Sequence, residues 1–128
     1  MTYYMATSLD ASFEAIIDRV EAALKEEGFG VLTRIDVRET MRAKLGKDFR
    51  PYVILGACNP KLAYEALQIE DKVGTMLPCN VVVQQSSTGK IEVAAVDPVS
   101  SMQAIDNPRL KDAAKAVREK LSRVIASL

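Results

Sequence analysis

Two long stretches of the chain carry hydrophobic residues at helical spacing. The first runs from Phe13 to Leu24, and Gly28 follows it as a residue suited to the left-handed end of a helix. The second and longer stripe runs from Leu110 to Leu128. Charged residues fill the positions between the apolar ones, so both stretches are predicted to be amphipathic helices that pack one face on a core.

Other stretches alternate apolar and polar residues, or are short and rich in β-branched residues, as strands are. In residues 29–35, Val31, Thr33 and Ile35 fall on one side, which predicts a strand with one buried face. The turn sequence Ser-Ser-Thr-Gly at 86–89 predicts a hairpin between its flanking strands. The strands predicted in this way cover residues 2–7, 29–35, 52–58, 81–85 and 90–96.

Shorter helices are predicted between these strands. A helix after Asp36 is expected to turn Val37, Met41 and Leu45 inward and to end at Gly46. Three more helices are predicted to begin where a polar capping residue is followed by proline, at 59–60, 97–98 and 107–108. Proline suits the first helical position because its missing N–H group would be unpaired there.

The order of elements predicts an α+β fold. Strands and helices interleave, but the last two strands form a hairpin, so the sheet cannot be all parallel. We expect a single domain over residues 1–128, built as a two-layer sandwich. Its mixed sheet of about five strands would carry helices mainly on one face, and a homodimer would cover the other face.

Composition narrows the functional classes. Lys+Arg and Asp+Glu number 17 each, so no basic excess points to nucleic acid. The chain has no histidine, which removes imidazole bases and histidine metal ligands. The start of the chain lacks the pattern of a secretory signal, and no apolar run is long enough to span a membrane. A cytoplasmic protein with reduced thiols and no membrane partner is expected.

Cys58 is the candidate catalytic residue. It ends the predicted strand 52–58 and lies one residue before the helix cap Asn59, close to a helix N-terminus whose partial positive charge favours a thiolate. The alternative is that Cys58 is an inert buried thiol, because unoxidised cysteine often behaves as a small hydrophobic residue.

The other candidate site residues are expected to bind a ligand. Cys79 and Asn80 lie just before the predicted strand 81–85, and the two thiols would come near each other if this strand and the strand 52–58 are neighbours running the same way. Two cysteines fall short of the four ligands of a structural zinc site, so no metal is predicted. Asn59 has an alternative role as a helix cap.

Arg50 and Tyr52, at the entry of the strand 52–58, complete the set of candidate ligand-binding residues. An arginine there could bind a carboxylate or phosphate through two hydrogen bonds. Alternatively, Arg50 could pair on the surface with Asp48 or Glu39, a contact that adds only about 0–1 kcal/mol.

Several sequence blocks resemble one known family. They are Gly-Val-Leu-Thr-Arg-Ile-Asp-Val at 30–37, Phe-Arg-Pro-Tyr at 49–52, Leu-Gly-Ala-Cys-Asn-Pro at 55–60, Leu-Pro-Cys-Asn-Val-Val-Val at 77–83 and Val-Ala-Ala-Val-Asp-Pro at 93–98. The chain is similar to the bacterial and archaeal domain-of-unknown-function family 302 over nearly its whole length. The resemblance implies a small α+β domain that is commonly dimeric, and it implies no activity and no cofactor.

Three functional hypotheses follow from the sequence. The first is a homodimeric binding module for a small molecule or partner near the strand ends that carry Cys58 and Cys79, where sites on sheets tend to lie. The second is a thiol-dependent enzyme, or a sulfur- or redox-handling protein, that uses Cys58. The third is a purely structural interaction domain.

Overall fold

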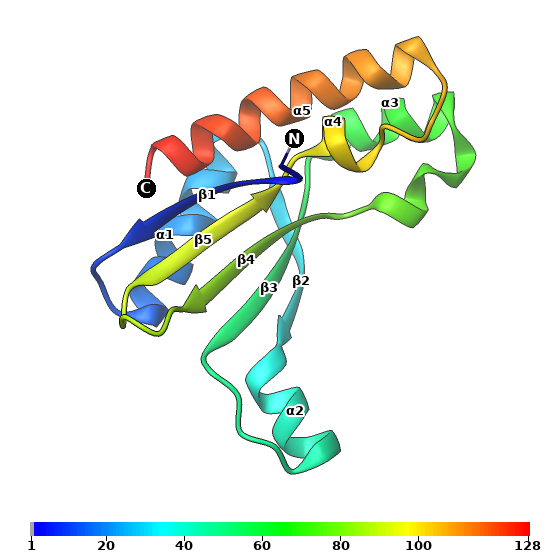
Figure 1. The fold of residues 1–128 in the computed structure, drawn as a ribbon. Coiled ribbons are helices and arrows are strands. Elements are labelled where there is room, and N and C mark those ends of the chain that lie inside the picture. The colour runs from blue at the N-terminus through cyan, green and yellow to red at the C-terminus, as the bar shows by residue number, and fades with distance from the viewer. Residues whose placement is uncertain (1) are drawn as a thin grey trace.

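The protein folds as one sheet with helices packed on one side, as a computed structural model that describes residues 2–128 shows (Figure 1). The helices and strands follow the predicted order, with an additional short 3₁₀ helix over residues 71–76. The elements are β1 (Tyr4–Leu9), α1 (Phe13–Glu26), β2 (Gly30–Asp36), α2 (Val37–Leu45), β3 (Tyr52–Cys58), α3 (Pro60–Ile69), η1 (Asp71–Met76), β4 (Cys79–Gln85), β5 (Ile91–Val96), α4 (Pro98–Ser101) and α5 (Pro108–Ala126).

The sheet has five strands in the order β1-β5-β4-β3-β2, and every neighbouring pair is antiparallel. The predicted α+β class and the number of strands are confirmed. The expected mixed sheet is corrected to an antiparallel one. The strands β1 and β2 run the same way, but the chain carries them to opposite edges of the sheet, so no parallel pair forms.

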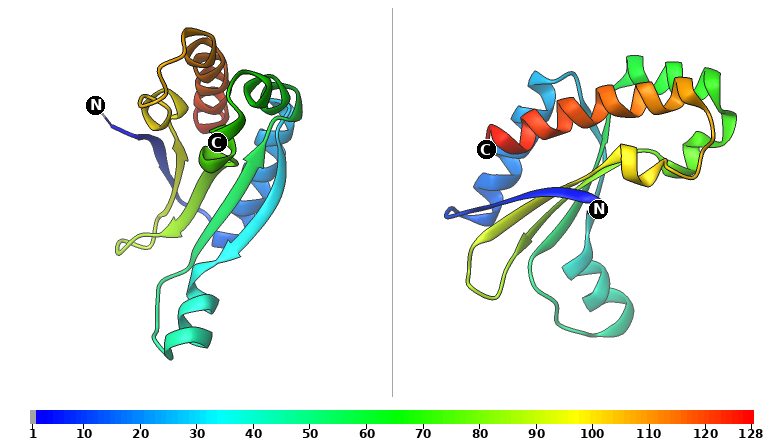
Figure 2. Two further views of the ribbon diagram at one scale, coloured as in Figure 1. Left: turned by 90° about the vertical axis from the view of Figure 1, so that its right-hand side faces the viewer. Right: turned by 45° about the horizontal axis from the view of Figure 1, so that its top comes forward.

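The core lies between one face of the sheet and the helices α1 and α5 (Figure 2). Alternate residues of each strand point into it, as the pleat of a strand requires. On β3 these are Val53, Leu55 and Ala57, all almost completely buried. The stripes predicted in the two long helices supply the opposite wall, for example Ile16 and Leu121, so this part of the helical prediction is confirmed.

The end of α1 is joined to α5 by an ion pair. Arg123 donates from Nε and Nη2 to Glu27 Oε1, at 3.1 and 3.0 Å. These hydrogen bonds lower the pKa of the Glu27 carboxyl and raise the pKa of the Arg123 guanidinium. The pair fixes the C-terminal half of α5 over α1.

The inward faces predicted for β2 and α2 are only partly confirmed, because Val31 packs against the core whereas Ile35 and the apolar residues of α2 do not. A register shift between Val31 and Thr33 interrupts the alternation of β2, and Ile35 is 48% exposed. Helix α2 extends away from the sheet (Figures 1 and 2) and has no buried residue, with Leu45 65% exposed. Its caps are as predicted, with Asp36 at the start and Gly46 left-handed at the end.

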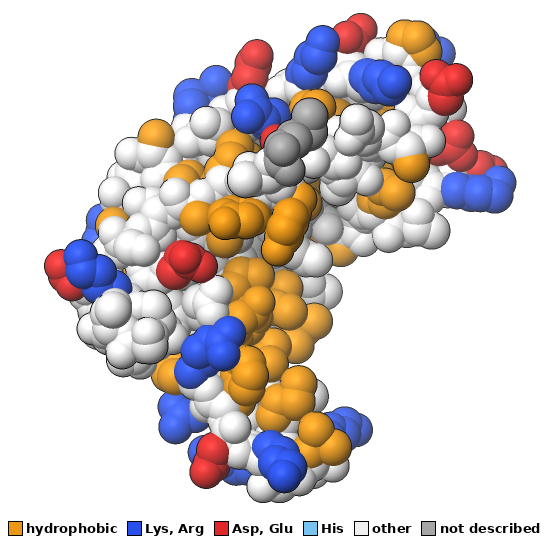
Figure 3. Space-filling view, in the orientation of Figure 1, with side chains coloured by type: hydrophobic (Ala, Val, Ile, Leu, Met, Phe, Trp, Pro, Cys, Tyr) orange, Lys and Arg blue, Asp and Glu red, His pale blue; other side chains and the backbone are white. Residues whose placement is uncertain are grey.

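The other face of the sheet carries none of α1, α3 and α5, and we call it the open face. Side chains on it include Tyr52 and Ile54 of β3 and Val82 of β4, which are only half-buried. Hydrophobic side chains gather from the middle of this face toward α2 (Figure 3). The open face therefore leaves apolar surface in contact with solvent.

Among residues 2–128, no helix combines the length and the hydropathy that a membrane span needs.

Candidate functional site

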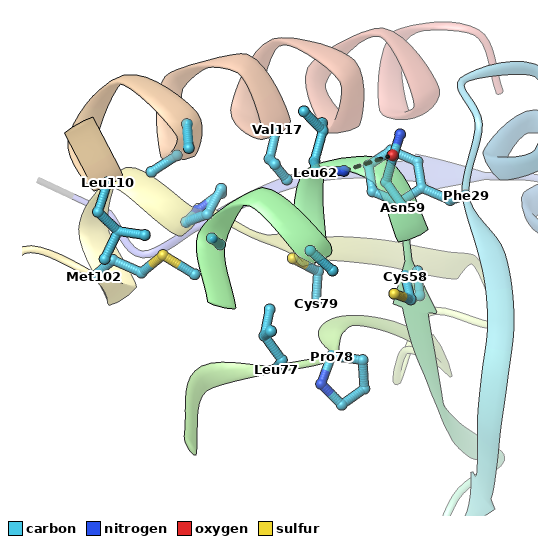
Figure 4. A pocket seen from close by; sticks show the side chains of 16 residues that line it. Phe29, Cys58, Asn59, Leu62, Leu77, Pro78, Cys79, Met102, Leu110 and Val117 are labelled. Carbon is cyan, nitrogen blue, oxygen red and sulfur yellow. Dashed lines mark hydrogen bonds between the residues drawn. The ribbon is translucent and has the colours of Figure 1, made fainter. Parts of the chain in front are cut away.

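An apolar pocket lies where the ends of β3 and β4 meet α3 and α5 (Figure 4). We call it the interlayer pocket, and its volume is about 40 Å³. Except for the two thiols and Asn59, its lining is hydrophobic. The lining residues are Phe29, Ala57, Cys58, Asn59, Leu62, Ala63, Ala66, Leu77, Pro78, Cys79, Pro98, Met102, Leu110, Ala113, Ala114 and Val117.

The two cysteines come together because their strands are antiparallel neighbours. Strand β3 ends at Cys58 and β4 begins at Cys79, so both thiols lie at the same end of the sheet. Ala57 pairs directly with Cys79 in the register. From the sequence, we expected the two thiols to come close only if the two strands ran the same way. Instead β3 and β4 are antiparallel, and the chain between them passes through α3 and returns to the same end of the sheet.

The blocks Leu-Gly-Ala-Cys-Asn-Pro and Leu-Pro-Cys-Asn contact each other where Pro78 packs against Gly56. A Cβ atom on Gly56 would lie 2.7 Å from Pro78 Cγ and still closer to Thr33 Oγ1. The bare backbone of Gly56 therefore lets Pro78, which follows a cis peptide bond, lie against the sheet. This contact positions the start of β4 and with it the wall of the pocket.

Asn59 has both of its polar side-chain atoms engaged within the fold. Its Oδ1 accepts from Leu62 N–H at 3.3 Å, which caps α3, and its Nδ2 donates to the carbonyl oxygen of Glu27 at 3.4 Å. The capping role is therefore the one that the geometry displays. Asn59 lines the pocket, but its hydrogen bonds connect the start of α3 to the end of α1.

The Cys79 thiol is buried, and its pKa is raised. Burial, and secondarily the nearby Cys58, raise its pKa from an ordinary value of 9.0 to about 11. A thiol with a raised pKa stays protonated at neutral pH, which makes Cys79 a weaker nucleophile than an exposed cysteine. Cys58 is more exposed, and both cysteines are free.

Within residues 2–128, no cluster of three or more aspartate, glutamate, cysteine or histidine residues is placed to hold a metal ion.

The remaining candidate residues lie away from the pocket. Arg50 and Tyr52 are at the opposite end of β3, and Arg50 contacts the side chain of Gln84. Asn80 and Tyr52 line a shallow hollow on the open face. The predicted site residues therefore divide between the interlayer pocket and the open face.

Sequence reasoning missed the helical half of the pocket. Ala113 and Ala114 of α5 face Ala63 and Ala66 of α3 across the pocket, and these small side chains leave space that larger ones would fill. Their positions in the sequence mark them only as part of an apolar stripe. The available signal was the run of alanines in both helices, which becomes informative once the helices are known to face each other.

The fold and this pocket define a small α+β domain with one apolar interlayer site at the end of its sheet. The chain belongs to the family described as domain of unknown function DUF302, which it matches over residues 5–128. It is also similar to an uncharacterized conserved DUF302 protein from Bacillus stearothermophilus whose crystal structure is known. The TM-score is 0.92 and the sequence identity 32%, and 98% of each chain is covered. No curated protein matches the sequence.

The resemblance read from the sequence blocks is thereby confirmed, and the family description carries no activity.

Proposed function

We propose that this protein is a binding module that holds the apolar part of a small uncharged molecule in the interlayer pocket. The observation that supports the proposal is the pocket itself, which is lined by alanine, leucine and valine side chains from two helices. Ligand sites are typically concave and mainly apolar, with a few polar groups that fix orientation. Here the thiols of Cys58 and Cys79 are the polar groups that face the pocket, beside Asn59, whose hydrogen bonds stay within the fold.

The size of the pocket limits the bound group. A volume of about 40 Å³ is well below the roughly 150 Å³ of a cavity that takes up benzene. It accommodates a short alkyl group, with the rest of the molecule extending through the open side. The bound part is uncharged, because no lining residue is an acid, a lysine or an arginine, and an unpaired charge is costly to bury.

The proposal predicts that 1-hexanol binds and that hexanoate, of the same chain length, binds at least tenfold more weakly. Binding is measured by NMR from the methyl signals of Leu62, Met102 and Val117, all pocket residues. Ala113→Leu should reduce the affinity for 1-hexanol at least tenfold, because the larger side chain occupies the pocket. Urea unfolding of the same variant checks that it is folded.

Ala126→Leu serves as the matched control, since Ala126 is an exposed residue of the same helix outside the pocket. Its affinity for 1-hexanol should equal that of the wild type. Equal binding by wild type and Ala113→Leu, or methyl shifts outside the pocket only, would refute the proposal.

We also propose that the protein is a homodimer that buries apolar residues at the β2 edge and on α2. Leu32, Ile35 and Leu45 are 67%, 48% and 65% exposed, and contiguous exposed apolar surface is typical of an interaction site. The formal net charge of zero leaves little repulsion between two copies.

The double variant Ile35→Glu, Leu45→Glu should be monomeric at concentrations where the wild type is a dimer, because it places two charges in the proposed interface. Sedimentation equilibrium measures the mass of each protein. Tyr64→Glu on α3, where Tyr64 is 67% exposed, is the control and should leave the dimer intact. A monomeric wild type at high concentration would contradict the proposal.

The thiol-dependent alternative has less support than the binding module. Burial raises the pKa of Cys79 and so disfavours a second thiolate, and the pocket lining offers no carboxylate or amine as a base. A reactive Cys58 and a cytoplasmic location both stay predictions.

A further inference from the structure

We infer that Arg50 and the hollow beside it on the open face form a second binding site, which takes a small organic monocarboxylate. This site lies at the opposite end of β3 from the interlayer pocket and does not depend on the function proposed for that pocket. The arginine supplies the anion contact, and the hollow receives the apolar body of the ligand.

Arg50 is held in place by two aromatic rings. Its Cζ lies 4.5 Å from the centre of the Phe49 ring and 5.4 Å from that of Tyr52. The two rings are themselves in edge contact, with their centres 5.9 Å apart. A guanidinium group stacked in this way is attracted by the ring faces and loses rotational freedom.

A chain of hydrogen bonds fixes the remaining orientation of Arg50. Arg50 Nε donates to Gln84 Oε1 at 2.9 Å, and Gln84 Nε2 donates to Glu92 Oε1 at 3.1 Å. Glu92 thus orients the amide so that its oxygen faces the arginine. The Nη groups of Arg50 have no hydrogen-bond or ion-pair partner among residues 2–128. Two donors are therefore ordered and available to a planar anion.

The hollow beside Arg50 suits an apolar body. Its volume is about 370 Å³, and its lining includes Tyr52 and Gln84, two of the three residues that contact Arg50. Val82 and Ala94 are part of the same lining, with Tyr3 and Tyr4 on the β1 side. Asn80 and Glu92 also line the hollow, and Arg50 lies beside the lining, in contact with Tyr52 and Gln84. An arginine next to a largely aromatic and aliphatic hollow suits a molecule with a carboxylate at one end and an apolar group at the other.

The local charge favours a single negative charge on the ligand. Arg50 is the cation of this cluster, and the half-buried Glu92 lies two hydrogen bonds away from it. Any anion bound here meets the single positive charge of Arg50 and the field of Glu92, which lines the hollow, so a monocarboxylate is repelled less than a phosphate dianion. The two parallel N–H donors of the Arg50 guanidinium, its fork, also fit the two oxygens of a carboxylate.

The test is an NMR titration of the full-length protein with phenylacetate, with phenylacetamide as the uncharged comparison. Phenylacetate should bind saturably and shift the signals of Arg50, Tyr52 and Gln84, and phenylacetamide should bind at least tenfold more weakly. Arg50→Met should reduce the affinity for phenylacetate at least tenfold. Arg50→Lys, which keeps the charge but not the fork, should reduce it about threefold to tenfold.

Arg109→Met is the matched control, because Arg109 is an exposed arginine at the start of α5, outside the hollow. It should bind phenylacetate as the wild type does. The inference is overturned if phenylacetate and phenylacetamide bind equally, or if Arg50→Met binds like the wild type. It is also overturned if Arg50→Met changes only the self-association of the protein, since Arg50 would then serve a contact between copies.

Discussion

Gly56→Ala is expected to lower the free energy of unfolding by about 2–3 kcal/mol, although it adds only one methyl group. The new Cβ atom would lie 2.7 Å from Pro78 Cγ and in collision with the Thr33 hydroxyl. Thr33 can relieve its contact by rotating. Pro78 cannot, because its ring lies against the sheet, so the start of β4 must shift.

The measurement is urea unfolding of the wild type, Gly56→Ala, Thr33→Ala and the double variant. The double variant should recover part of the loss, since it removes the Thr33 contact and keeps the Pro78 contact. Gly30→Ala is the matched control in the same sheet, because a Cβ atom there meets no atom within 4 Å. It should change stability by less than about 0.5 kcal/mol. A similarly small effect for Gly56→Ala would show that Pro78 moves freely.

The displacement should also reach the interlayer pocket. Pro78 and Cys79 both line it, so a shift at the start of β4 changes its shape. We therefore expect Gly56→Ala to weaken binding of 1-hexanol as well as folding, whereas Gly30→Ala should affect neither.

Asp97→Ala is expected to destabilise the protein by about 3 kcal/mol. Asp97 Oδ1 accepts from Val99 N–H at 3.0 Å and caps α4, while Oδ2 accepts from Arg118 Nε at 2.9 Å. The Asp97 side chain is only 9% exposed, and that of Arg118 is 49% exposed. The variant loses the cap and the charge-assisted bond, but Arg118 regains water, which keeps the loss below that of a fully buried pair.

Asn107→Ala provides the comparison, because Asn107 caps α5 by accepting from Arg109 N–H at 3.0 Å and has no ion pair. It should lose only about 1 kcal/mol. Asp97→Asn, which can keep the cap and loses the charge, should fall between the two alanine variants. Urea unfolding measures all three, and equal losses for Asp97→Ala and Asn107→Ala would show that the bond to Arg118 contributes nothing.

The repeated capping residues illustrate what local sequence can determine. Asn59, Asp97 and Asn107 each act at a helix start as predicted, since a cap depends on residues two or three positions away. The long stripes of α1 and α5 were equally readable, because helical spacing alone identifies the buried face. The class of fold followed from the order of these elements.

Contacts between distant segments were not readable in the same way. The exposure of Ile35 and Leu45 depends on a register shift in β2 and on the position of α2, which no other element among residues 2–128 buries. Apolar spacing cannot distinguish a core from surface that awaits a partner. The orientation of Arg50 likewise depends on a hydrogen bond to Gln84, which lies on a neighbouring strand thirty-four positions away.

Local spacing and distinctive blocks were enough to identify the strands, the main helices, the family and the caps of α2, α3, α4 and α5. The start of α1 was not identified, because its cap Ser12 lies beyond the positions 8 and 10 at which the sequence favoured a helix start. Only the tertiary structure decided that Cys58 and Cys79 share one end of the sheet, since that depends on the antiparallel pairing of β3 with β4. It also decided that the alanines of α3 and α5 leave a pocket beside the thiols. A cavity is formed by what distant segments fail to fill, so no local pattern can specify it.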